Sequence, residues 1–202
     1  IMSFNFSTKF DYFPKMFIGE RQLDVVKSSK LLGIIISTDL KWNEHTFYIV
    51  KKATKRLWFL RRLSKLGASK ETLLEMFQLS IRNLMEQGAP VFTGALSKGN
   101  INDFENVQKQ AFKIILRGNF DNYESALKTL RQETLEERRK YLCLKFAKNS
   151  LHGQKTQKMF PLKRKIQNTI KGEKFHVKNA KKDRLRKSAI PYMQRLLNQY
   201  QA

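Results

Sequence analysis

The chain has 202 residues, and its 40 Lys and Arg against 17 Asp and Glu give it a formal net charge of +23. Hydrophobic residues make up 41% of the chain, which is enough to build a core and argues against wholesale disorder. A single cysteine, Cys143, excludes an internal disulfide framework and a cysteine-based zinc cage within the chain.

The charge and the absence of long apolar runs limit which cellular compartment and which class of binding partner we expect. No apolar run approaches the roughly 18 residues of a membrane span, and the first residues lack a signal-peptide pattern. Together with the single cysteine, this predicts an intracellular protein of the nucleus or cytoplasm. Such an excess of positive charge repels itself unless a polyanion neutralises it, and nucleic acid is the first candidate. A membrane is not expected as a partner, because no helix with a large apolar face accompanies the charge.

Residues 1–40 carry the pattern of short β-strands. Apolar and polar residues alternate over residues 2–6, which is the period of a half-buried strand. Two short runs on either side of Gly19 predict a hairpin with the glycine at its turn. The run over residues 31–36 is apolar on both faces and therefore predicts a buried strand.

From Trp42 onward the hydrophobic period becomes helical. The first helix, over residues 44–66, lacks Pro and Gly and is expected to end at Gly67. Further helices are expected after an N-cap at Ser69, from about Ile101, over residues 123–130, after a capping box at Thr134 and Glu137, and over residues 189–200.

Composition divides the chain into three parts. Residues 1–40 hold the predicted strands, residues 41–153 hold the main helices, and residues 154–202 form a basic linker or tail with a short terminal helix. The predicted fold class is α+β and predominantly α, with a small antiparallel β part, a helical bundle and a basic tail.

The helix over residues 44–66 has two chemically distinct faces. One side carries four apolar residues, Ile49, Ala53, Leu57 and Leu60, and the opposite side carries Lys51, Lys55, Trp58, Arg62 and Lys65. A solvated face normally mixes charges of both signs, whereas the one acid of this helix is Glu44. Such a row of cations can follow a phosphate backbone while the aromatic ring stacks on a base or sugar. Alternatively, Trp58 packs on a neighbouring element and the lysines only keep the chain soluble.

The sequence contains no recognisable catalytic constellation. It has no Ser, His and acid close together, no Gly-rich phosphate loop, and no cluster of carboxylates of the kind that two-metal phosphoryl transfer needs. Cys143 lies at apolar helical spacing, which favours a buried, inert thiol. His45 stands near a helix start and is expected at the surface or its boundary. No catalytic residue, metal site or cofactor is therefore assigned to this chain.

Seven segments, in their order and spacing, resemble the reverse transcriptases of non-long-terminal-repeat (LINE-type, jockey-like) retrotransposons. They are LLGIII at 31–36, DLKW at 39–42, IVKKA at 49–53, LRRL at 60–63, MEQGAPVF at 85–92, FENVQKQA at 104–111 and TLEERR at 134–139. The resemblance covers nearly the whole chain and implies the C-terminal part of an RNA-directed DNA polymerase.

The resemblance also implies roles for particular residues. The family's primer grip, at the end of the palm, maps onto Leu31, Leu32 and Gly33, with Leu31 in place of the usual aromatic. The helical part resembles the thumb that cradles the template–primer duplex, and Phe92, where Trp is usual, is expected in its core. The family's catalytic aspartates precede the primer grip and lie outside this chain. The chain is thus not expected to be catalytic alone, and Mg²⁺ is implied only for the parent enzyme. The implied partners are the RNA and DNA of the duplex and the polymerase's palm and fingers.

Two other functions stay open from the sequence. A free-standing basic nucleic-acid-binding module without enzymatic activity would carry the same row of cations. A helical protein-interaction domain would carry the charge for solubility alone. The reading frame upstream of Ile1 separates the first alternative from a polymerase, and binding to duplexes at low salt separates the second from both.

Overall fold

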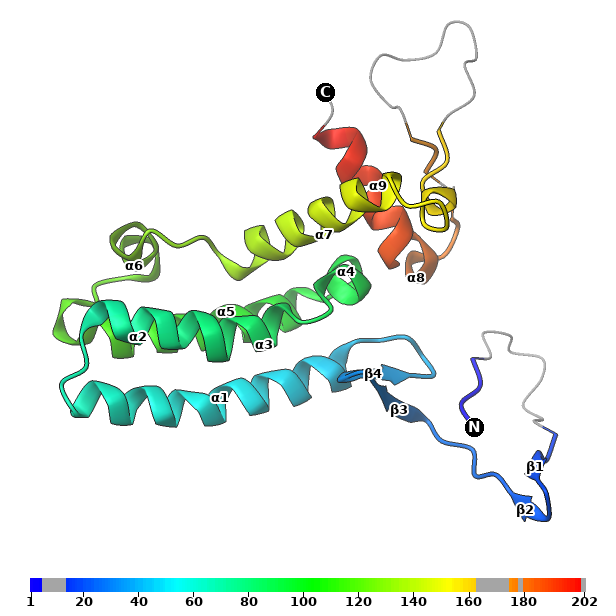
Figure 1. Cartoon of the computed structure of the whole chain (residues 1–202), viewed down its shortest axis with the longest axis horizontal. Coiled ribbons are helices and arrows are strands. Elements are labelled where there is room, and N and C mark those ends of the chain that lie inside the picture. The colour runs from blue at the N-terminus through cyan, green and yellow to red at the C-terminus, as the bar shows by residue number, and fades with distance from the viewer. Residues whose placement is uncertain (5–13, 163–174, 178–179, 201–202) are drawn as a thin grey trace, which may run out of the picture.

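The computed structural model describes residues 1–4, 14–162, 175–177 and 180–200. These residues form mostly helices with two small antiparallel sheets, which confirms the predicted fold class (Figure 1). In one sheet β1 (Phe17–Ile18) pairs with β2 (Arg21–Gln22), and in the other β3 (Ser28–Leu31) pairs with β4 (Ile34–Ser37).

The helices follow the sheets along the chain. They are α1 (Asn43–Lys65), α2 (Lys70–Met76), the π-helical η1 (Phe77–Arg82), α3 (Asn83–Glu86), α4 (Ala89–Phe92), α5 (Lys98–Leu116), α6 (Tyr123–Leu130), α7 (Leu135–Leu151), α8 (Asp183–Arg186) and α9 (Ala189–Gln199). Short 3₁₀ turns are η2 (Thr93–Ala95), η3 (Arg117–Asn119) and η4 (Gln157–Met159).

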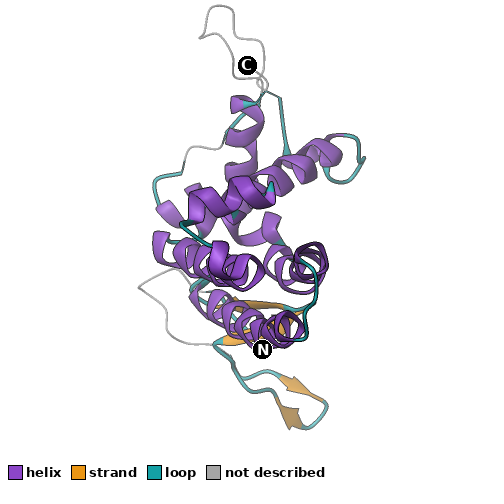
Figure 2. Cartoon of the chain, turned by 90° about the vertical axis from the view of Figure 1, so that its left-hand side faces the viewer, coloured by secondary structure: helices purple, strands orange, loops and turns teal. Residues whose placement is uncertain are grey.

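The long helices stack in layers. α1 packs along α5 and against α2, η1 and α3, while α7 packs against α5, α4 and α9. Figure 1 shows α1 along one edge of the stack and α7 toward the other, and Figure 2 looks at the lower helices end-on. α5 thus lies between α1 and α7, so these two helices present outward faces on different sides of the molecule.

α1 forms where its pattern predicts, because both its periodicity and its stop signal are local. Its four predicted apolar residues are buried in the main core. Gly67 follows the helix with a φ of +85°, a conformation that favours glycine, and lets the Ala68 N–H donate back to the Leu63 carbonyl at 3.2 Å. The predicted caps at Ser69 and Thr134 are also confirmed, the second as a complete capping box.

The apolar run over residues 31–36 is not one buried strand, so that prediction is wrong. Its first residue ends β3, its last three belong to β4, and Leu32 and Gly33 form the turn between them. Both turn residues have positive φ, +49° and +86°, as in the tight turns that match the twist of a hairpin. Leu32 is 88% exposed, because the tip of a hairpin cannot bury its side chain.

The N-terminal hairpin is confirmed in part. β1 and β2 pair around Gly19, which has a φ of +59°, and Figure 2 shows this hairpin projecting away from the helices. The strand predicted over residues 2–6 is wrong for the described residues 1–4, which have no strand structure, and the rest of it lies outside the described residues. The Ile1 carbonyl instead accepts a hydrogen bond from the Val26 N–H at 2.8 Å.

The C-terminal segment was expected to be a basic tail, but its described part packs against α7. A second core cluster joins two residues of α7, two isolated aromatics and the apolar face of α9: Cys143, Ala147, Phe160, Phe175, Met193, Leu196 and Leu197. The Asn198 side chain also bonds to both the N–H and the carbonyl of Phe175. These few apolar side chains and hydrogen bonds suffice to pack the segment against α7, although its average composition is strongly polar and cationic.

Candidate nucleic-acid interface

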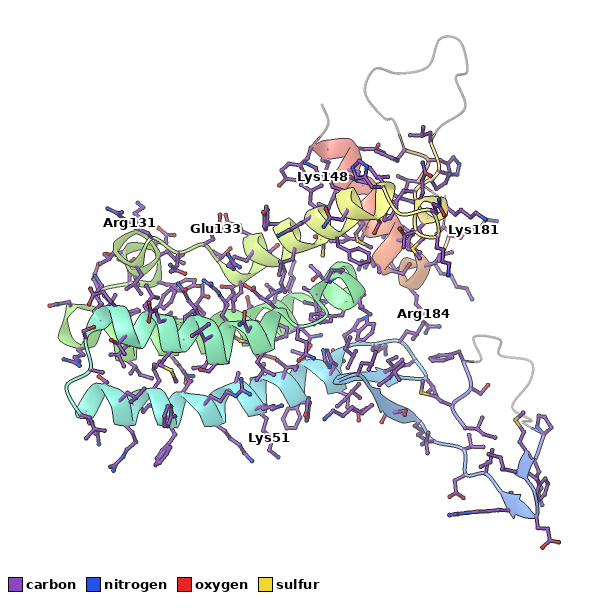
Figure 3. All side chains as sticks on the ribbon, in the orientation of Figure 1. Lys51, Arg131, Glu133, Lys148, Lys181 and Arg184 are labelled. Carbon is purple, nitrogen blue, oxygen red and sulfur yellow. The ribbon has the colours of Figure 1, made fainter. Side chains whose placement is uncertain are left out.

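The five residues predicted on the outer face of α1 share that face in the structure. Lys51, Lys55, Trp58, Arg62 and Lys65 are all exposed, and Trp58 is 62% exposed. We call these five residues the α1 row. Figure 3 shows Lys51 pointing away from the other helices. The alternative in which Trp58 packs on a neighbouring element is not met, because the ring lies on the surface.

The four cations of the α1 row are not taken up by ion pairs with described residues. Within the described part of the chain, no acidic side chain forms an ion pair with any of the four. Glu44, the one acid of α1, lies in its first turn and accepts a hydrogen bond from the Ser28 hydroxyl at 2.9 Å. The row therefore presents a surface of one sign, which is unusual for a purely solvated helix face.

Two aromatic rings lie next to cations on the outer face of α1. Lys51 Nζ lies 5.9 Å from the centroid of the Phe47 ring, and Arg62 Cζ lies 6.0 Å from the Trp58 ring. Both pairs are four residues apart, so each ring and its cation are neighbours on the helix surface. Phe47, which is 68% exposed, was not singled out from the sequence. The repeated four-residue spacing was a signal that could have found it.

A second aromatic–cation group flanks the α1 row where β3 meets the helix. Lys30 Nζ donates to the Tyr48 hydroxyl at 2.7 Å and lies 4.6 Å from the centre of its ring, and Lys52 lies 5.9 Å from the same ring. The hydrogen bond from Lys30 lowers the pKa of Tyr48. Sequence alone could not find this group, because it depends on the contact between a strand and a helix.

The β3–β4 hairpin, which carries the predicted primer-grip residues at its tip, packs on the first turns of α1. Ser28 and Lys30 of β3 contact Glu44 and Tyr48, so the hairpin runs alongside the first turns of α1 and its tip points along that helix. A Cβ placed on Gly33 would stand 3.0 Å from the Gln87 amide nitrogen. The positive φ favours glycine there, whereas the contact alone would not exclude a Cβ, because the atom that it meets is the end of an exposed, flexible Gln side chain.

Two charged or titratable residues of α1 face inward rather than toward a ligand. The Arg56 guanidinium donates to the Ser80 carbonyl in η1, so this arginine ties α1 to its neighbour.

His45 was expected at the surface or its boundary, and that prediction is wrong because it is 1% exposed. Its Nδ1 accepts a hydrogen bond from the Ile35 N–H at 3.2 Å, and its ring packs between Trp42 and Phe92. β4 covers this end of the helix, and burial lowers the pKa of His45.

Two further residues that the sequence singled out, Cys143 and Phe92, are part of the packed core. Cys143 is buried as predicted, and burial raises the pKa of its thiol to about 11. Phe92 is confirmed as a core aromatic. Among the residues that the structure describes, no three His, Cys, Asp or Glu side chains lie close enough together to hold a metal ion.

No helix in the described ranges combines the length and the apolar character that crossing a membrane requires. Searches against protein-family models, curated proteins and solved structures find no match to this chain. The geometry of the α1 row and of the β3–β4 tip therefore carries the functional argument.

Proposed function

We propose that this chain binds a template–primer duplex of RNA and DNA along the α1 row, as the C-terminal part of a reverse transcriptase of a non-long-terminal-repeat retrotransposon. The observation that carries the proposal is the α1 row itself, with four exposed cations free of ion pairs to described acids and an exposed Trp58 among them. The resemblance in seven ordered segments supports the polymerase context.

The size and charge of the row suit a nucleic-acid backbone. From Lys51 to Lys65 it extends about 21 Å at 1.5 Å per residue, which is long enough to meet several successive phosphates. Each lysine or arginine that contacts a phosphate releases a condensed counterion, and this release drives binding without regard to sequence. The exposed rings add stacking contacts to a base or a sugar edge.

The role of this surface in a polymerase is positional. A duplex held along α1 passes the β3–β4 tip, where Leu32 is exposed and Gly33 has a positive φ. Holding a primer end in place brings its hydroxyl near the reacting phosphate and removes the entropic cost of that encounter from the chemical step. The chemistry itself belongs to a preceding palm, and no residue of this chain is assigned a catalytic role.

A matched pair of variants tests the proposal. K51Q/K55Q removes two charges from the α1 row, and K109Q/K128Q removes two exposed charges from α5 and α6. In about 0.1 M salt, loss of two phosphate contacts should weaken binding to a 20-bp RNA–DNA hybrid about 100-fold, as measured by fluorescence anisotropy. The control variant should bind nearly as well as the wild type. Equal affinity of the two variants would reject the α1 row as the binding surface.

A further inference from the structure

A second exposed row of the same chemistry lies on α7. Tyr141, Lys145, Lys148 and His152 follow one another at spacings of three or four residues and are all exposed, Tyr141 by 57%. We call these four residues the α7 row. It lies opposite the buried residues of α7, among them Leu135, Arg139, Cys143 and Ala147. An aromatic ring next to cations on an outward helix face is the same arrangement as in the α1 row.

The α7 row is also free of compensating acids. The two acids of α7 both lie in its first turn, where Glu136 pairs with Lys140 at 2.8 Å and Glu137 closes the capping box. Lys145 and Lys148 form no ion pair with any described acid. From residue 140 to the end, 17 Lys and Arg stand against two acids, so this end of the chain carries most of the net charge.

The two rows face different sides of the molecule. α5 lies between α1 and α7 and packs against both of them. In Figure 3, Lys51 lies on the lower edge of the helical stack, and Lys148 lies near its upper edge. A straight nucleic-acid segment that follows the α1 row therefore leaves the α7 row uncovered.

We propose that one copy of this chain bridges two nucleic-acid segments, one along the α1 row and one along the α7 row. This inference rests on the proposed function, because it assigns the same class of ligand to the second row. The partner at α7 is a phosphate backbone bound through charge and stacking, without sequence preference, and more weakly than at the α1 row, because two lysines stand here against four cations there. The affinity for a single hybrid therefore reports the α1 row. Because the layers between the rows are a packed core, both segments are held at a fixed separation.

A capture assay tests the bridge. A biotinylated 20-bp RNA–DNA hybrid is immobilised, the chain is added below the concentration of the hybrid, and a fluorescent second hybrid is supplied in solution. The wild type should retain the fluorescent hybrid. K145Q/K148Q should still bind a single hybrid through the α1 row but should lose most of the capture. The control K109Q/K128Q should capture as the wild type does.

The outcomes separate this inference from the proposed function. If the wild type binds one hybrid but never captures a second, bridging is wrong and the proposed function stands. If K145Q/K148Q captures as much as the wild type, the α7 row is not the second surface. If no hybrid binds at all, both proposals fail. Where the wild type does capture a second hybrid, analytical ultracentrifugation gives the stoichiometry of the complex. One chain with two hybrids supports the bridge, and two chains with two hybrids overturn it.

Discussion

Arg138 of α7 donates to both carboxylate oxygens of Glu86 at the end of α3, with Nη2 to Oε2 at 3.1 Å. Arg82, one turn before Glu86, lies 3.8 Å from the same carboxylate. Glu86 therefore holds two arginines; its side chain is nearly buried, and that of Arg138 is partly buried. The pair joins the end of α3 to the first turns of α7, across 52 residues of the chain.

Replacing Glu86 by Gln should leave two neighbouring arginines without their counter-charge. We expect a loss of about 1–3 kcal/mol in the free energy of unfolding, because buried donors lose a charged acceptor. Urea titration followed by circular dichroism measures it. Glu75→Gln, on the exposed face of α2, is the matched control and should change stability little. Equal stabilities of the two variants would show that the pair contributes nothing.

Arg139 is fully buried against the Phe104 ring, 4.7 Å from its centroid, and its guanidinium has no hydrogen-bond partner among the described residues. Burial lowers the pKa of Arg139, which means that its charge is costly there. Arg139→Met keeps the volume and removes the charge, so it should stabilise the fold by about 1–4 kcal/mol. Arg139→Ala should be about 2–5 kcal/mol less stable than the Met variant, because it leaves a cavity. A Met variant less stable than the wild type would contradict this account.

Leu32 has a positive φ at the tip of the β3–β4 hairpin, where its exposed side chain gains nothing from packing. Asn tolerates this backbone conformation better than Leu. We expect Leu32→Asn to raise the free energy of unfolding by about 1 kcal/mol, as thermal unfolding would show. Leu79→Asn makes the same change at an exposed helical position and should give no gain. A gain in both variants would point to lost surface hydrophobicity rather than relieved strain.

His45 predicts a pH dependence of stability. Its pKa in the folded chain is lowered, so the unfolded chain, with a His pKa of about 6.5, binds the proton more readily. Stability should therefore be unaffected by His45 above pH 6.5 and should fall as the pH drops below it, toward the lowered folded pKa. His45→Gln should reduce the loss of unfolding free energy between pH 7 and pH 5, whereas His152→Gln, at an exposed position, should not. An unchanged loss in His45→Gln would refute the linkage.

The sequence predicts local features of this fold well. The two faces of α1, the caps at Ser69 and Thr134 and the burial of Cys143 all follow from spacing within one helix. These same regularities locate the α1 row, since a helix that buries Ile49 and its companions must expose the residues on its opposite side.

Features that depend on contacts between distant segments were missed. His45 is buried only because β4 covers the start of α1. The tip at Leu32 looks like the middle of an apolar strand, because its Leu carries no turn signal and only Gly33 does. The docking of α9 depends on single aromatics such as Phe175, which a composition average does not register.

The salt dependence of duplex binding tests the central claim most directly. With six phosphate contacts, from the four cations of the α1 row and from Lys30 and Lys52 beside it, the affinity of the wild type for a 20-bp RNA–DNA hybrid should fall by about 10³ between 50 and 200 mM salt. In K51Q/K55Q the slope of log K against log salt should be smaller by about two, one for each lost contact. An affinity that does not change with salt, or an identical slope in the variant, would contradict the account.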